Sequence, residues 1–113
     1  PGMKYKHYAP KTPVVLLDGD GQDVLAFLQK EQAAAPCAIL CYDEEIPSLR
    51  PEGLLPVGKR ADLSAQAHAL FGRLREADTL GASVIYAHLP PKEGLGLALY
   101  NRIRAAAHTV KKV

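Results

Sequence analysis

The sequence is poor in the residues that build common catalytic and metal sites. It has no tryptophan, one methionine and two cysteines among 113 residues, and its cysteines and histidines lack zinc-site spacing. No glycine-lysine-serine phosphate loop occurs, GDGQDV lacks the third glycine of a dinucleotide fingerprint, and no nucleophile is flanked by a base. The globular part of the sequence therefore indicates a ligand-binding or interaction module without a metal site, rather than an enzyme.

Large charge and long apolar runs are also missing. Fourteen lysines and arginines against twelve aspartates and glutamates give a net charge of +2, too little for a protein built to neutralise nucleic-acid phosphates. The apolar runs fall short of the ~20 residues that span a bilayer, and no signal-peptide pattern is present. With 48% hydrophobic residues, we expect one compact, soluble, cytoplasmic domain that binds neither nucleic acid nor a membrane.

The two cysteines, Cys37 and Cys41, lie four residues apart in an apolar run that is typical of a strand. Residues four apart on a strand are separated by about 13 Å, which is too far for a disulfide bond. We therefore expect two buried thiols, as in a cytosolic protein.

Short apolar runs bounded by glycine or proline predict the strands of the domain. They cover Val14–Asp18, Cys37–Tyr42 and Ala82–Ala87. A weaker run covers 54–58, where a proline favours an edge position in the sheet over a central one. The polar segment 43–53 contains two prolines and is expected to be a loop.

Apolar residues at helical spacing predict three helices between the strands, over 19–35, 61–78 and 94–110. Asp62 or Ser64 can cap the second helix, and the last three residues are expected to be a frayed tail. The alternation of strands and helices predicts an α/β fold. It is expected to be a Rossmann-like three-layer sandwich with a mostly parallel sheet, preceded by an extended arm.

Ligands usually bind beyond the carboxyl ends of parallel strands, and the sequence places candidate groups there. The first group, which directly follows a predicted strand, consists of Gly19, Asp20, Gly21 and Gln22. Its glycines suit a tight strand-to-helix turn as well as they suit phosphate binding. Asp18, Asp20 and Asp23 could suggest a magnesium site, but acids at the start of a helix also favour its dipole.

Two further groups follow the later strands. Asp43, Glu44 and Glu45 form an acidic run, which we interpret as a solvated surface. His88 stands at a strand end and is a candidate for hydrogen bonding or proton transfer. His68 lies among alanines on a predicted helix and is expected at the surface or its boundary.

The start of the last helix offers another candidate anion site, which consists of Gly94, Gly96, Asn101 and Arg102. Free N–H groups at a helix N-terminus can hold an anion. The alternative is that the two glycines let the loop turn while the leucines of this helix pack against the sheet, and composition favours that alternative.

The N-terminal arm (residues 1–13) differs from the rest of the chain, because its polar residues have no obvious structural role. It contains lysines, tyrosines and a histidine but no acidic residue. Together these side chains suit an anionic, aromatic ligand such as a nucleotide. Three prolines restrict its backbone and lower the entropy lost on binding. A basic linker with no ligand is the alternative.

The run PGMKYKHYAPKTPVVLL closely resembles the interdomain linker of the two-domain threonylcarbamoyl-AMP synthases, and GLGLALYNRIRAAA resembles a stretch near the end of their C-terminal domain. The resemblance implies that residues 1–13 are the linker arm and residues 14–113 the Rossmann-like C-terminal domain. The chain would then be a C-terminal fragment without the YrdC-like catalytic domain, inactive when isolated. That catalytic domain combines L-threonine, bicarbonate and ATP into threonylcarbamoyl-AMP and pyrophosphate, for threonylcarbamoyladenosine modification of tRNA.

The resemblance also implies roles for residues of the arm, which would act as a lid on the catalytic domain. The residues that would contact the nucleotide or intermediate are Lys4, Tyr5, Lys6, His7 and Tyr8. Gly2 and Met3 would shape the turn, and this chain would contribute no catalytic residue. Lys6 stands where the family often has arginine, so a salt contact would remain but a bidentate one would not. ATP and Mg²⁺ are expected for the full-length enzyme, with no cofactor in this chain and no direct tRNA binding.

Two alternatives from other functional classes remain open. One is an independent regulatory domain that binds a nucleotide or anion around 19–22 and 94–96. The other is an interaction module that docks onto the YrdC-like domain or onto the threonylcarbamoyl transferase complex.

Overall fold

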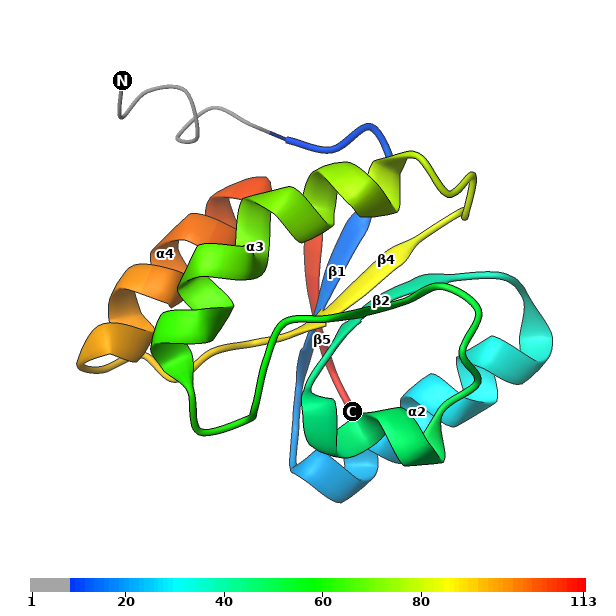
Figure 1. Ribbon diagram of the computed structural model, residues 1–113, viewed down its shortest axis with the longest axis horizontal. Helices are drawn as coiled ribbons and strands as arrows, with labels where there is room; N and C mark the ends of the chain where they lie inside the picture. Colours follow the sequence, from blue (N-terminus) through cyan, green and yellow to red (C-terminus); the bar gives the residue numbers. More distant parts are fainter. Residues whose placement is uncertain (1–8) are drawn as a thin grey trace.

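The computed structural model describes residues 9–113, which form one parallel sheet flanked by helices (Figure 1). In chain order the elements are β1 (Val14–Asp18), α2 (Gly21–Ala34), β2 (Ala38–Cys41), the 3₁₀-helix η1 (Asp43–Ser48), β3 (Leu54–Pro56), α3 (Leu63–Asp78), β4 (Ile85–His88), α4 (Leu95–Ala106) and β5 (Thr109–Lys112). The strand order is β3-β2-β4-β1-β5, and all four neighbouring pairs are parallel.

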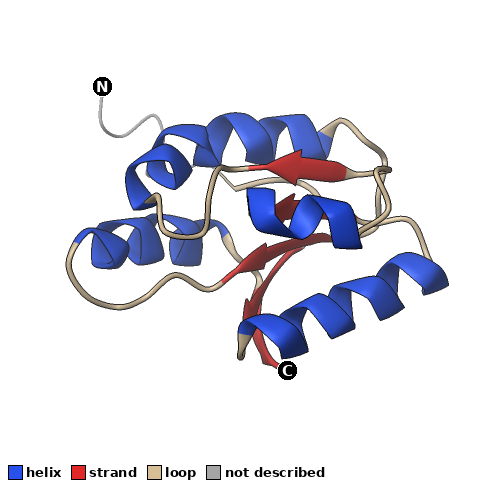
Figure 2. Ribbon diagram, turned by 60° about the horizontal axis from the view of Figure 1, so that its bottom comes forward, coloured by secondary structure: helices blue, strands red, loops and turns tan. Residues whose placement is uncertain are grey.

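The helices cover both faces of this sheet, which confirms the expected α/β sandwich (Figures 1 and 2). Helices α3 and α4 pack on one face, while α2 and η1 lie on the other. Side chains alternate along each strand and so separate the core into two layers. In β1, Val14 and Leu16 point toward α3 and α4, whereas Leu17 packs with Val24 and Leu28 of α2.

Both cysteines lie on the α2 side of the sheet and are free and buried, as predicted. Cys41 ends β2 close to Glu45. Burial, followed by the nearby negative charge of Glu45, raises the pKa of the Cys41 thiol to about 11. This cysteine therefore remains a thiol at neutral pH and packs as a small apolar side chain.

The two edges of the sheet are made by its shortest and most exposed strands. The predicted edge position of the proline-containing strand is confirmed, because β3 pairs with β2 alone and contains Pro56. The secondary structure predicted for the C-terminal residues is wrong. The last helix ends at Ala106 rather than at Val110, and Lys111 and Lys112 of the expected frayed tail belong to β5, which pairs with β1.

Backbone contacts explain why the chain ends as a strand. All four side chains of β5 are exposed, so no apolar pattern marks it in the sequence. It is held instead by the β1 ladder and its flanks, where the His108 N–H donates to the Val14 carbonyl at 2.8 Å and the Val113 N–H to the Asp18 carbonyl at 2.9 Å. Two lysines on this edge discourage pairing with a further strand.

Helix α3 shows how a local signal fixes a helix boundary. Of the two proposed caps, Asp62 is the one that the structure contains, since its Oδ1 accepts the N–H of Ala65 at 3.0 Å. Leu70 and Leu74 of this helix are buried against the sheet. None of the helices in the described part of the chain is both long and apolar enough to cross a membrane.

Candidate functional site

A polar cluster lies where β2 and β4 end, at the carboxyl edge of the sheet. His88 is the last residue of β4, and its Nε2 lies 2.9 Å from each carboxylate oxygen of Glu45. Tyr42 directly follows β2, and its ring stacks on the His88 ring with centroids 4.1 Å apart and planes 19° apart. We call Tyr42, Glu45, Arg60 and His88 the carboxyl-end network.

The local sequence places Glu45 there through the first turn of η1. Tyr42 is the N-cap of this 3₁₀-helix, and the Glu45 side chain reaches back so that Oε1 accepts the Tyr42 N–H at 2.8 Å. The Glu45 N–H in turn donates to the Tyr42 carbonyl at 2.9 Å. A glutamate three residues after the cap satisfies a backbone donor that the turn would otherwise leave unpaired.

The contact between Glu45 and His88 is buried inside the domain and is not a surface contact. The side chains of Glu45 and His88 are only 3% and 9% exposed. Burial raises the pKa of Glu45, but hydrogen bonds from His88 and from the Tyr42 N–H, together with the Arg60 charge, lower it overall. The ionised carboxylate can only accept, so Nε2 of His88 carries the shared proton. Burial also raises the pKa of Tyr42 to about 12.

Arg60 covers the network from the solvent side. Its guanidinium lies 4.7 Å from the centroid of the Tyr42 ring and its Nη2 is 4.0 Å from Glu45 Oε2. The Arg60 N–H donates to Glu44 Oε1 at 2.9 Å, which fixes the backbone of the loop before α3. The Arg60 side chain remains 47% exposed, so it is the one member of the network that faces solvent.

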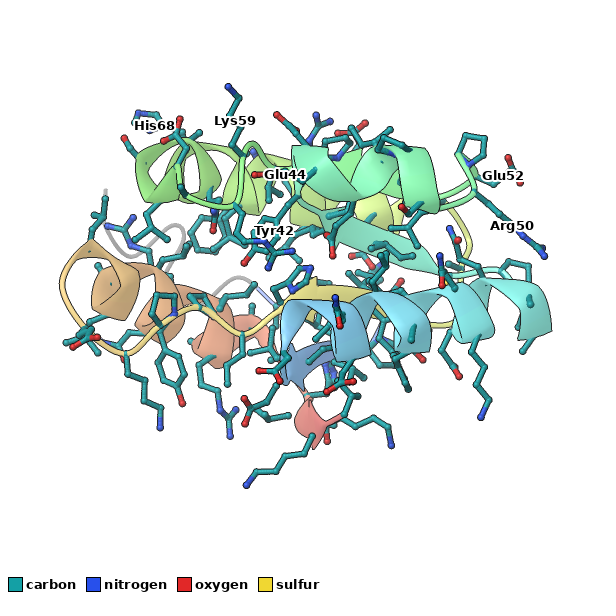
Figure 3. All side chains as sticks on the ribbon, turned by 90° about the horizontal axis from the view of Figure 1, so that it is seen from below. Tyr42, Glu44, Arg50, Glu52, Lys59 and His68 are labelled. Carbon is teal, nitrogen blue, oxygen red and sulfur yellow. The ribbon has the colours of Figure 1, made fainter. Side chains whose placement is uncertain are left out.

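An open cleft of about 620 Å³ borders Arg60, within the size range of small-molecule sites. Its lining comes from the start of α2, from η1 and from the loop before α3, and consists of Asp20, Gly21, Gln22, Asp23, Leu25, Glu44, Glu45 and Arg60. In Figure 3, Tyr42 lies between an upper row of helices, α3 and η1, and a lower row, α4 and α2. Glu44 lies above it, and Arg50 and Glu52 lie at the far end of the view. Four carboxylates against one guanidinium make this cleft unfavourable for a polyphosphate.

The structure brings Asp20, Gly21 and Gln22 of the first predicted group to this cleft, and Gly19 precedes them outside its lining. Asp20 is the N-cap of α2 without a side-chain cap hydrogen bond, and Asp23 lies in the first turn, where a negative charge favours the helix dipole. Among residues 9–113, no three histidine, cysteine or acidic side chains gather in a way that could hold a metal ion. The backbone at Gly19 packs closely against Val113. A Cβ at this position would lie 2.8 Å from the Val113 carbonyl oxygen.

The group at the start of α4 does not join the cleft. Gly94 is the N-cap of α4 with φ +60°, and Gly96 is buried so closely that a Cβ would lie 2.7 Å from Pro91. Asn101 and Arg102 are exposed on this helix. The positive φ of Gly94 and the close contact of Gly96 fit a structural role for the two glycines. The expected packing of the leucines is only partly found, because Leu99 is buried whereas Leu95 and Leu97 are 52% and 43% exposed. His68 is exposed as expected, and its Nδ1 lies 3.1 Å from the Ser64 carbonyl.

The acidic run after β2 contains the main error in the predicted site. Asp43 and Glu44 are exposed, as a solvated surface requires, but Glu45 is 3% exposed and belongs to the network. The sequence held one signal for this, the glutamate three residues after Tyr42 at the start of a turn. His88 does form hydrogen bonds, to Glu45, whereas its place in a ligand site stays a prediction. Arg60 was missed, because its partners come from other elements.

A second polar contact lies at the opposite, amino edge of the sheet. The N–H groups of Lys11 and Thr12 donate to the two carboxylate oxygens of Asp78, at 2.9 Å and 2.8 Å. Pro10, just before them, is buried. We call Lys11, Thr12 and Asp78 the Asp78 clamp. Other predicted residues of the arm lie outside the described part of the chain, namely Gly2, Met3, Lys4, Tyr5, Lys6, His7 and Tyr8.

The chain is similar to known proteins over almost its full length. The family model described as threonylcarbamoyl-AMP synthase, C-terminal domain, matches residues 1–108. The threonylcarbamoyl-AMP synthase of Bacillus subtilis (strain 168) is 32% identical over 108 residues, which are 95% of this chain and 31% of that protein. The threonylcarbamoyl-AMP synthase of Pyrococcus abyssi (strain GE5 / Orsay) is 33% identical and is also covered over 31% of its length. The chain thus spans about a third of the curated relatives it matches.

Solved structures agree with this similarity. The crystal structure of P. abyssi Sua5 complexed with L-threonine matches 100% of this chain and 33% of that chain, with 30% identity and a TM-score of 0.72. Because the family model covers nearly all of the sequence and the fold matches, this chain belongs to the family of threonylcarbamoyl-AMP synthase C-terminal domains.

Proposed function

We propose that this chain is the linker and C-terminal domain of an enzyme that converts L-threonine, bicarbonate and ATP into threonylcarbamoyl-AMP and pyrophosphate, for tRNA modification in the cytoplasm. The N-terminal arm acts as a lid on a YrdC-like catalytic domain, and the described domain anchors it. The observation that carries this proposal is the extent of the family match, which includes the whole arm together with the domain (residues 1–108).

The chemistry of adenylylation explains what such a lid would do. Cations beside the triphosphate offset the charge that develops as pyrophosphate leaves. Closure also keeps water from a labile mixed anhydride. Lys4 and Lys6 supply cations, while Tyr5, His7 and Tyr8 supply ring faces and hydrogen-bonding groups.

The described domain supports the anchoring half of the proposal. In its carboxyl-end network, Glu45 pairs with His88 and with the Tyr42 N–H, and no buried side-chain nitrogen or oxygen within residues 9–113 lacks a hydrogen-bond partner. The neighbouring cleft is acidic. ATP and Mg²⁺ would therefore be bound by the catalytic domain, and this chain alone is expected to have no synthase activity.

The test compares ATP-dependent pyrophosphate release, with threonine and bicarbonate present, by four preparations. These are this chain, the separately made N-terminal domain, their mixture and the intact enzyme. We expect efficient turnover only from the intact enzyme, because a lid acts on a cleft to which it is covalently tied. An N-terminal domain that is as active alone as the intact enzyme would overturn the lid role.

A double variant of the arm makes the test residue-specific. His7→Ala with Tyr8→Ala in the intact enzyme should lower turnover on the order of tenfold or more, while the melting temperature of this domain stays nearly unchanged. His68→Ala is the matched control, because this exposed histidine lies on α3 and contacts only Ser64 among the described hydrogen bonds. Full activity of the double variant would contradict the proposal.

A second candidate function is a regulatory site for an anion or nucleotide. The observation that favours it is the exposed guanidinium of Arg60 in the open cleft beside the start of α2. The four carboxylates of the cleft oppose it. Titration of this chain with ATP, GTP and magnesium by calorimetry separates the two candidates, since the lid role predicts no tight binding without the catalytic domain.

An interaction module is the remaining alternative, docked on the catalytic domain or on the transferase complex. In that case, Lys4→Ala with Lys6→Ala would weaken complex formation and leave the catalytic step of the assembled enzyme unchanged.

A further inference from the structure

The segment that leads into β1 is held to the domain before the first strand begins. In Figure 1 this segment runs past the C-terminal end of α3, and its backbone bonds there to Asp78, the last residue of that helix. Between Pro10 and Pro13, only Lys11 and Thr12 have backbone N–H groups, because proline has none. The Asp78 carboxylate accepts both of them, one on each oxygen.

Helix stability does not explain an aspartate at this place. A negative charge at the C-terminus of a helix faces the negative end of the helix dipole and is unfavourable there. Burial also raises the pKa of Asp78, yet the hydrogen bonds from Thr12 and Lys11 lower it overall, so the carboxylate is ionised when it holds the segment. Its partners come from 66 and 67 residues away in sequence. The side chain thus serves the incoming backbone rather than its own helix.

Contacts on both sides of the clamp fix the direction of the segment. Pro10 is buried on the N-terminal side. On the C-terminal side, the Pro13 carbonyl accepts the Ile85 N–H at 2.8 Å, and the Val14 N–H donates to His108 Nδ1 at 3.1 Å. The chain is therefore attached to the domain from residue 10 onward, several residues before β1.

From this geometry we propose that Asp78 is a positioning residue for the lid, because it clamps Lys11 and Thr12 and so sets the point from which the arm departs. This inference rests on the proposed function. With the clamp closed, the arm departs from the domain at residue 10, so residues 11–13 add no length to the connection with the catalytic domain. With the clamp open, the connection lengthens by the residues up to Pro13, and the effective concentration of the lid at its cleft falls.

The first part of the test measures the clamp in this 113-residue chain by amide hydrogen exchange. Asp78→Ala should speed exchange of the Lys11 and Thr12 amides about tenfold, as expected when hydrogen bonds to a charged acceptor are lost. Asp78→Asn keeps one acceptor oxygen and should give an intermediate result. Unchanged exchange at both amides in Asp78→Ala would overturn the clamp, whatever the arm does in catalysis.

The second part measures turnover of the intact enzyme. Asp78→Ala should lower pyrophosphate release on the order of tenfold through misplacement of the lid. Asp62→Ala is the matched control, because it removes the same side chain and charge from the opposite end of α3 without touching the arm. Equal losses of turnover in the two variants would reduce the role of Asp78 to ordinary stability and overturn the proposal.

The two parts also separate this inference from the proposed function. Faster amide exchange with undiminished turnover in Asp78→Ala, while His7→Ala with Tyr8→Ala remains impaired, would overturn the positioning role and leave the lid intact. Full activity of both variants would overturn the lid and the positioning role together.

Discussion

Two carboxylates at opposite ends of one parallel sheet have different uses. At the carboxyl edge, Glu45 is buried and bonds to His88 and to the Tyr42 N–H, all within the folded domain. At the amino edge, the Asp78 carboxylate accepts backbone N–H groups of a segment that enters the domain from outside it. Glu45 thus connects groups within the domain, whereas Asp78 attaches the incoming segment to the domain.

The difference teaches where function can be sought in this domain. Ligand sites in parallel sheets usually lie at the carboxyl edge, yet there the buried polar groups are already paired and the adjacent cleft is acidic. The amino edge holds the connection to the arm. We therefore expect changes at the carboxyl edge to act mainly on stability, and changes at the amino edge to act mainly on the arm.

The strongest test of the carboxyl edge is Glu45→Ala in this chain. Removal of the Glu45 carboxylate leaves His88 and the Tyr42 N–H buried without their acceptor. We expect the free energy of unfolding to fall by about 3 kcal/mol, because each buried polar group that loses its partner costs about 1–3 kcal/mol. Urea denaturation followed by circular dichroism measures it.

Two neighbouring variants sharpen the result. Glu45→Gln keeps an oxygen for the Tyr42 N–H but loses the charge opposite His88, so its loss should be smaller than that of the alanine variant. Glu44→Ala removes the adjacent exposed carboxylate and should change stability little. An alanine variant of Glu45 no less stable than that of Glu44 would show that the network is not a stabilising feature.

Acid should weaken the carboxyl edge. The pKa of Glu45 is lowered in the folded domain from its ordinary value of 4.5, since hydrogen bonds and charges outweigh the effect of burial. A carboxyl with a lowered pKa contributes stability that is present above the unfolded pKa and is lost as pH falls through the folded pKa. The domain should therefore lose stability as pH falls below about 4.5.

Chemical denaturation at a series of pH values, for the parent chain and Glu45→Gln, measures this loss. The variant should show a shallower decline. Glu44 and Asp78, whose pKa values are also lowered, remain in it and keep part of the acid dependence. Identical slopes for the two proteins would assign the acid sensitivity to those two carboxylates instead.

The sequence allowed most of the fold to be predicted, because buried strands and amphipathic helices leave apolar patterns. Val14–Asp18 was predicted with the bounds that the structure has. The strand Thr109–Lys112 was missed, since its side chains are all exposed and its place depends on backbone bonds to a strand almost a hundred residues earlier. The pattern of apolar residues indicates which side chains are buried, and an exposed edge strand has no such pattern.

The site was less predictable for a related reason. His88 could be identified as a strand-end group, but its partner depends on the sheet order, in which β4 lies beside β2 although α3 and β3 separate them in sequence. Glu45 in an acidic run looks like any solvated glutamate. Asp78 gave no signal either, because its partners are backbone groups, and backbone N–H groups are the same at every residue except proline.

The amino edge should give a much smaller loss of stability than Glu45→Ala gives at the carboxyl edge, which is what most clearly separates the two regions. Asp62→Ala removes the cap of α3 and should cost about 1 kcal/mol of unfolding free energy. Asp78→Ala removes a partly exposed carboxylate that opposes the dipole of the same helix, so its loss of stability in this chain should be smaller than that of Asp62→Ala. Thermal melting of both variants beside the parent measures the order. If Asp78→Ala instead destabilised the chain as much as Glu45→Ala, the clamp would be part of the core structure and the contrast between the two edges would fail.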